Sequence, residues 1–225
     1  MDHTFNFSIR TALRQAWATF RLHAGFFLSL AVITIVLSIV GGGNTPWYVQ
    51  LILTLASFIW SIVWLRVSLA AARNDETKMT FSSLRELIPT GIEILYMIGI
   101  FILGGLIVLC GLILLIIPGI YVAFRLSFAN LAYLDRKEGI QKSLRYSWNI
   151  TKGKFWTVFL TGIVAFALYM VGILTLGIGL LITYPLASIL IARLYIVLSE
   201  HYHSKEGVVV QPVEIPADLP ATETV

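Results

Sequence analysis

Apolar residues in this chain occur in long uninterrupted blocks. Segments 28–40, 94–124 and 155–192 contain no charged residue. A bilayer core about 30 Å thick requires roughly 20 apolar residues in each helical crossing. The blocks are continuous rather than alternating, so they do not fit the strands of a membrane barrel. The pattern therefore predicts an all-α membrane protein.

We expect six spans, with one boundary open to two interpretations. The apolar run from Ile92 to Leu134 is about twice the length of one crossing, so it must fold back. The turn fits Gly111 or Pro118-Gly119. Gly111 is favoured, because the last span then also starts at glycines and carries Pro185 inside, and Pro118 becomes a tolerated kink. The predicted spans are 24–40, 48–72, 92–109, 112–134, 155–174 and 177–199.

Positive charges fall on one side of this predicted bundle. The turns near 41–47, 110–111 and 175–176 contain no lysine or arginine. The opposite segments contain twelve: Arg10, Arg14, Arg21, Arg73, Lys78, Arg85, Arg136, Lys137, Lys142, Arg145, Lys152 and Lys154. By the positive-inside rule, these segments and both termini face the cytoplasm.

A short motif recurs before each pair of spans. Ile9-Arg-Thr-Ala-Leu-Arg-Gln-Ala-Trp17 resembles Ile140-Gln-Lys-Ser-Leu-Arg-Tyr-Ser-Trp148, and a weaker copy is Phe81-Ser-Ser-Leu-Arg85. The second span of each pair also contains one arginine in its later half. We therefore predict a six-span domain over 1–204, made of three repeat-like units at about 7–72, 80–134 and 138–199. Each unit is an interfacial amphipathic helix followed by a transmembrane hairpin.

The first and third copies have the periodicity of amphipathic helices, with cations on one face. Such helices lie in the headgroup plane, where anionic lipid attracts each nearby cation by roughly 1 kcal/mol. They either anchor and orient the bundle or recognise a particular anionic lipid or partner. The candidate lipid-binding surface consists of Arg10, Arg14, Arg21, Lys142, Arg145, Lys152 and Lys154.

A resemblance to known proteins is carried by two segments. These are Gly111-Leu-Ile-Leu-Leu-Ile-Ile-Pro-Gly-Ile-Tyr-Val-Ala-Phe-Arg-Leu-Ser127 and Ser143-Leu-Arg-Tyr-Ser-Trp-Asn-Ile-Thr-Lys-Gly153. They resemble a bacterial group of six-span inner-membrane proteins related to the membrane domain of some glycerophosphodiester phosphodiesterases. The resemblance covers roughly 8–200 and implies fold and location, namely a multi-pass protein of the bacterial inner membrane. It implies no hydrolysis, because the soluble phosphodiesterase domain is not in this sequence.

Ionisable residues inside spans are candidate functional groups by default. Here they are Arg66, Arg125, Arg193 and Glu93. An arginine at mid-membrane costs about 2.5–3.5 kcal/mol on insertion scales. One interpretation is structural anchoring, by snorkelling or by an ion pair with Glu93; the other is a ring of arginines that converge and bind a lipid phosphate or anionic substrate. We expect Arg125 to contact either Glu93 or a lipid phosphate.

No enzyme constellation or metal site is predicted. Composition agrees with a membrane protein, since 58% of the residues are hydrophobic and 12% charged, against about 45–50% and 25% in soluble domains. The spans contain no histidine, aspartate or lysine, and Cys110 is the only cysteine. His201 and His203 alone make a poor metal site. We expect no catalytic residue, no metal and no cofactor.

These patterns lead to two functional hypotheses. The first is a non-enzymatic inner-membrane protein that organises lipid or a partner protein at the cytoplasmic face. The alternative is a small transporter or lipid-translocating protein, which needs a polar path reaching both faces. Expected partners are membrane lipids, anionic headgroups above all, and a protein partner or a second copy; nucleic acid is not expected. Segment 205–225 has the composition of a disordered cytoplasmic tail.

Overall fold

The computed structural model describes residues 7–41, 46–74, 87–175 and 178–205, which form helices without strands. The predicted amphipathic helix near residue 80 and nearly all of the predicted tail lie outside these ranges. The helices are α1 (Ile9–Leu22), α2 (Ala24–Gly41), α3 (Trp47–Ala72), α5 (Gly91–Leu114), α6 (Ile116–Leu126), α7 (Ala129–Arg136), α8 (Ile140–Ile150), α9 (Phe155–Leu174) and α10 (Leu180–Lys205).

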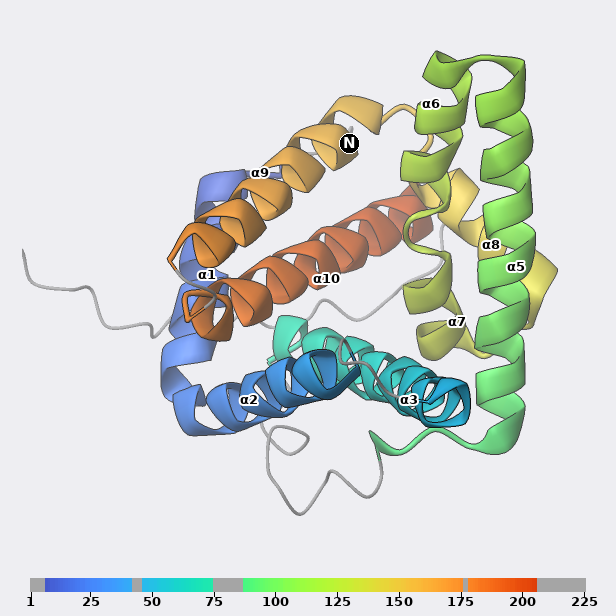
Figure 1. The fold of residues 1–225 in the computed structure, drawn as a ribbon. Coiled ribbons are helices and arrows are strands. Elements are labelled where there is room, and N and C mark those ends of the chain that lie inside the picture. The colour runs from blue at the N-terminus through green and yellow to red at the C-terminus, as the bar shows by residue number, and fades with distance from the viewer. Residues whose placement is uncertain (1–6, 42–45, 75–86, 176–177, 206–225) are drawn as a thin grey trace, which may run out of the picture.

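The long helices pair into three hairpins, which confirms the predicted all-α membrane fold. The pairs are α2 with α3, α5 with α6–α7, and α9 with α10. In Figure 1, α3, α6–α7 and α10 border the centre, while α2, α5 and α9 lie further out. Within the described residues, α3, α5, α6–α7, α9 and α10 are each long and apolar enough to cross a membrane. If the pair of α1 and α2, which is bent by 93°, is also counted as one span, the described residues contain six spans.

Short helices precede two of the hairpins where the sequence predicts them. α1 begins at Ile9, where Ser8 caps it by accepting a hydrogen bond from the Thr11 N–H at 3.4 Å. α8 begins at Ile140, directly after Gly139. Gly139 has φ +93°, a conformation that favours glycine, and it lets the chain turn sharply from α7 into α8.

The predicted turn of the middle hairpin is wrong in position. α5 continues past Gly111 to Leu114, and the chain reverses at Leu115, whose backbone is extended. Pro118 is not a kink. It lies in the first turn of α6, where backbone N–H groups have no helical partner, so the missing N–H of proline breaks no hydrogen bond. The correct turn lies between the two positions that the sequence offered.

The predicted span 112–134 is also not one continuous helix. It breaks at Ser127 and Phe128 into α6 and α7. The Ser127 hydroxyl donates to the Phe124 carbonyl at 2.8 Å, a local bond that competes with helix continuation. By contrast, Pro185 lies inside α10, as expected.

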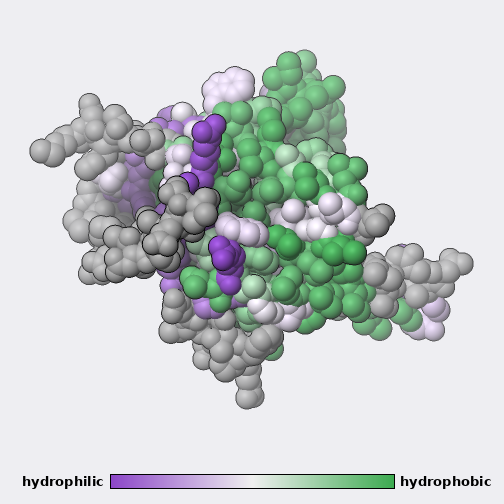
Figure 2. Space-filling view, turned by 90° about the vertical axis from the view of Figure 1, so that its left-hand side faces the viewer, coloured by the Kyte–Doolittle hydropathy of each residue, from purple (hydrophilic) through white to green (hydrophobic). Residues whose placement is uncertain are grey.

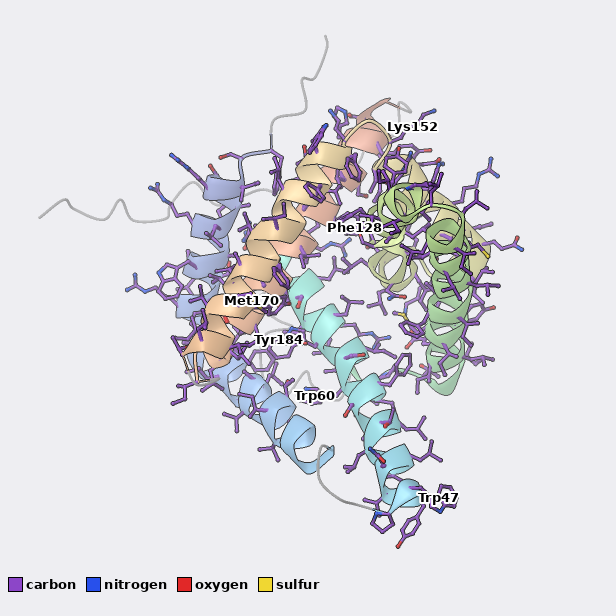
Figure 3. The ribbon with its side chains drawn as sticks, turned by 45° about the horizontal axis from the view of Figure 1, so that its top comes forward. Trp47, Trp60, Phe128, Lys152, Met170 and Tyr184 are labelled. Atoms are coloured by element: carbon purple, nitrogen blue, oxygen red, sulfur yellow. The ribbon has the colours of Figure 1, made fainter. Side chains whose placement is uncertain are left out.

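The three inner helices meet in one apolar cluster. Leu69 of α3, Leu131 of α7 and Leu198 of α10 belong to it, each at most 8% exposed. Helices α7 and α8 lie close to this meeting point (Figure 1). We call this part of the molecule the charged end, because the segments bearing lysine and arginine gather there. Figure 3 shows Lys152 and Trp47 at opposite extremes of the molecule.

The spans expose apolar side chains over most of their length. Phe101, Leu106, Ile113, Leu160 and Phe166 are all exposed. Figure 2 shows a broad hydrophobic face with hydrophilic side chains gathered toward one side. An exposed apolar surface of this extent is typical of a protein embedded in lipid.

Candidate anion-binding sites at the charged end

Arg66 of α3 forms an ion pair with Glu93, the first acidic residue of α5. Its other terminal nitrogen donates to the carbonyls of Leu87 at 3.1 Å and Ile88 at 3.4 Å. Glu93 also pairs with Lys137 and accepts the Thr90 N–H at 2.9 Å. Arg66 thus has a carboxylate partner, shared with Lys137, between the first and second units, as the structural interpretation expects.

Arg125 of α6 has a different environment and does not contact Glu93, so that alternative for Arg125 is wrong. It is 5% exposed, and its guanidinium lies 4.0 Å from the centre of the Trp148 ring. It donates to the Trp148 carbonyl and, at 2.8 Å, to the Tyr121 hydroxyl. Among the described residues no carboxylate pairs with Arg125. Its charge is stabilised by a carbonyl, a hydroxyl and an aromatic face.

Arg193 of α10 is 7% exposed and binds only neutral oxygens in the described part of the chain. It donates to Gln15 Oε1 at 2.9 Å, to Thr19 Oγ1 at 3.1 Å and to Asn74 Oδ1 at 3.0 Å. Its Nε has no partner among the described residues. It borders a cavity of about 350 Å³ between α1, the end of α3 and α10.

The three arginines share no described hydrogen-bond partner, so their hydrogen bonds give no support to the predicted ring. Their placement nevertheless follows the repeat. When the motif arginines Arg85 and Arg145 are aligned, Ile88 stands opposite Trp148, and the carbonyls of these two residues accept from Arg66 and Arg125.

Arg193 extends the same arrangement back to the start of the chain. Aligning Arg14 with Arg145 places Trp17 opposite Trp148. The two α1 partners of Arg193, Gln15 and Thr19, lie two positions on either side of Trp17. Each inner-helix arginine therefore binds the beginning of the next unit, and the last one binds the first unit.

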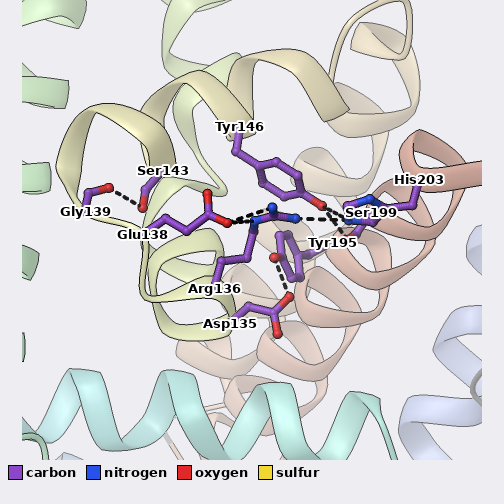
Figure 4. Close-up of polar contacts among 9 residues, drawn as sticks. All are labelled: Asp135, Arg136, Glu138, Gly139, Ser143, Tyr146, Tyr195, Ser199 and His203. Carbon is purple, nitrogen blue, oxygen red and sulfur yellow. Dashed lines mark hydrogen bonds and ion pairs between the residues drawn. The ribbon is translucent and has the colours of Figure 1, made fainter. Parts of the chain in front are cut away.

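A polar contact joins the inner helices at the charged end. Asp135 of α7 pairs with Arg73, at the end of α3, and accepts the Tyr195 hydroxyl of α10 at 2.8 Å. One carboxylate thus links all three units. Figure 4 shows the hydrogen bond between Asp135 and Tyr195 beside a second group around Arg136.

The second group connects α8 with the end of α10. Arg136 pairs with Glu138 and lies 3.1 Å from His203 Nε2. The Tyr146 hydroxyl is 2.6 Å from Ser199 Oγ and 3.0 Å from His203 Nε2. Burial raises the pKa of Tyr146, so this hydroxyl keeps its proton at neutral pH. The group fastens α10 to α7 and α8 (Figure 4).

The predicted lipid-binding cations lie on the outer faces of α1 and α8 and in the segment that follows α8. Arg10, Arg14 and Arg21 are exposed, whereas Ala12, Ala16 and Phe20 of α1 are buried. On α8, Lys142 and Arg145 are exposed, as is Lys152 beyond it; Lys154 is partly exposed. The apolar face of α1 packs against α10 and α2, so a large part of it is covered by protein.

Several residues of these sites have no signal in the sequence. Gln15, Asn74 and Asp135 are ordinary polar residues, and no local sequence pattern marks them as binding partners. Their roles depend on which helices meet, and the repeat alignment is the one signal that points to the α1 and α8 contacts. Among the described residues, no group of three potential metal-ligating acids, histidines or cysteines occurs.

Residues 80–217 match the protein family described as Domain of unknown function (DUF7847). The match begins where the second predicted unit begins and includes the second and third hairpins. No curated protein and no solved structure matches the chain.

Proposed function

The chain belongs to the family described as Domain of unknown function (DUF7847), and for this member we propose a non-enzymatic role in binding anionic lipid. The protein resides in the bacterial inner membrane with both termini in the cytoplasm. Its charged end lies at the cytoplasmic headgroups. There it organises lipid, and a protein partner or second copy is recruited to the same face.

One observation carries this proposal: exposed cations lie on α1, on α8 and in the segment that follows α8, beside spans whose outward side chains are apolar. Lys142 and Arg145 project from α8, and Lys152 follows it. Each cation near an anionic membrane surface contributes roughly 1 kcal/mol of attraction. Because the apolar spans fix the depth of the molecule, this attraction acts on headgroups rather than on soluble anions.

The alternative function that the sequence allows, that of a transporter, has less support. A transport path needs polar groups along the whole depth of the bundle. In the described residues, the buried arginines and their partners belong to the charged end, where Asp135 ties the three inner helices together. We therefore favour binding over translocation.

The test compares lipid retention by two triple variants of α8 and the segment after it. Lys142→Gln, Arg145→Gln and Lys152→Gln together should lower co-purified anionic lipid severalfold, as measured by native mass spectrometry. The matched control, Lys142→Arg, Arg145→Lys and Lys152→Arg, keeps every charge and should retain lipid like the parent. Equal retention by both variants and the parent would exclude this surface as the lipid-binding element.

A further inference from the structure

The cavity beside Arg193 is lined by matching faces of two helices. On α10 the lining residues are spaced as i, i+3, i+4 and i+7, and so are those on α1. The α10 residues are Arg193, Ile196, Val197 and Glu200, and those of α1 with its N-cap are Ser8, Thr11, Ala12 and Gln15. Because Gln15 bonds Arg193, the two helices run side by side along the cavity.

The cavity has opposite charges at separate positions on α10. Arg193 is almost fully buried and has only neutral partners in the described residues, with Nε unpaired. Glu200 lines the same cavity, and no described cation forms an ion pair with it. Arg73 acts on Glu200 electrostatically, but Asp135 already pairs with Arg73.

The spacing of these charges limits the ligand. Glu200 is seven positions after Arg193, which corresponds to roughly 10 Å of helix rise at 1.5 Å per residue. The two side chains are therefore not placed to neutralise each other as an adjacent pair. Apolar and small residues, Ala12, Ile196 and Val197, line the wall between them. A compact ligand with an anionic group at one end and a cationic group at the other is complementary to such a cavity.

The geometry points to a specific binding site for a phosphate–ammonium zwitterion, with the phosphate at Arg193 and a primary ammonium at Glu200. The guanidinium is always charged and attracts phosphate oxygens, and a primary ammonium donates three hydrogen bonds to acceptors such as carboxylate. This chemistry is that of a phosphoethanolamine headgroup. It goes beyond the proposed surface binding of anionic lipid, since it requires a cation on the ligand.

The experiment titrates the full chain in detergent with short-chain phospholipids of different headgroup and measures bound lipid by native mass spectrometry. Phosphatidylethanolamine should bind more tightly than phosphatidylcholine, whose trimethylated ammonium cannot donate to Glu200. Glu200→Gln should remove about tenfold of this preference, the effect expected from one charge-assisted hydrogen bond. Binding of phosphatidic acid, which has no ammonium, should be retained in that variant.

Two further variants distinguish binding at this cavity from a general effect of removing charge at the same end of the molecule. Glu138→Gln removes an acid at the same end that does not line the cavity, and it should leave the headgroup preference unchanged. Arg193→Lys keeps the charge but not the planar fork, so it should weaken all phosphate ligands. An unchanged ethanolamine-to-choline ratio in Glu200→Gln, or an equal loss in Glu138→Gln, would overturn the proposal.

The source of the zwitterion is resolved by competition. Soluble glycerophosphoethanolamine that displaces the lipid at equal concentration would identify a free small molecule as the ligand. Displacement only at large excess would identify the lipid headgroup. The triple variant of the preceding proposal should leave the ethanolamine preference intact, so failure of the surface proposal and failure of this one are distinguishable.

Discussion

Three arginines in the inner helices show how one residue type is stabilised in three ways. Arg66 has a carboxylate partner, Glu93. Arg125 has an indole face and a carbonyl, and Arg193 has three neutral side-chain oxygens. A buried guanidinium without such groups is costly, because its desolvation has no compensation. Arg193 is buried, its Nε has no partner among the described residues, and it adjoins a cavity, which is why we place a ligand there.

Arg125 is expected to contribute stability rather than ligand affinity. In Arg125→Leu, the cation–π contact with Trp148 and the bond to Tyr121 are lost, and we expect the free energy of unfolding to fall by about 1–3 kcal/mol. Arg125→Lys retains the charge over the ring and should lose less. The measurement is thermal unfolding in detergent. The exposed Arg145→Leu is the control, with a change of about 0.5 kcal/mol or less; if both leucine variants behaved alike, Arg125 would have no structural role.

At the scale of elements, the apolar blocks and repeated motif predicted the hairpins, α1 and α8, because hydrophobic periodicity is a local property. The turn of the middle hairpin was not predictable from glycine positions. Gly111 and Gly119 are not turn residues; they face each other across the turn and permit close backbone approach. A Cβ on Gly119 would lie 2.6 Å from the Leu112 nitrogen.

The candidate sites were predictable only in part for a related reason. The ionisable residues in the spans could be named, and an arginine paired with Glu93 was among the alternatives, although Arg125 rather than Arg66 was the expected partner. The partners of Arg125 and Arg193 could not be named, since they depend on where α8 and α1 dock. Gln15 and Arg193 are 178 positions apart in sequence, and no local pattern connects them.

The middle hairpin offers a matched pair of glycines for testing the close approach. Gly119→Ala should be destabilising by about 1–3 kcal/mol, because the added methyl group meets backbone atoms that cannot move away without opening the hairpin. Gly105→Ala is the control in the preceding helix, where a Cβ meets nothing within 4 Å. Thermal unfolding of both variants in the same detergent decides the matter. Equal stability of the two variants would mean that the close approach of α5 and α6 at Gly119 does not contribute to stability.

At the scale of the whole molecule, contacts between units close on themselves. Arg66 binds the start of the second unit, Arg125 binds α8 of the third, and Arg193 binds α1 of the first. Asp135 joins the three inner helices at the charged end. Through these contacts each hairpin is held by both of its neighbours at the charged end. An end held in this way is suited to presenting a fixed binding surface.

Orientation in the membrane is the property on which the proposed function depends, and it is directly testable. Twelve lysines and arginines belong to the segments of one side and none to the opposite turns, so we predict that the charged end is cytoplasmic. In a Cys110→Ser background, Lys142→Cys on α8 and Thr175→Cys at the end of α9 place one thiol at each end. An impermeant thiol reagent added to intact cells should label the Thr175 variant only, and inverted vesicles should reverse the result. Labelling of the Lys142 variant from outside would place the cationic surface away from the cytoplasm and refute the proposed orientation.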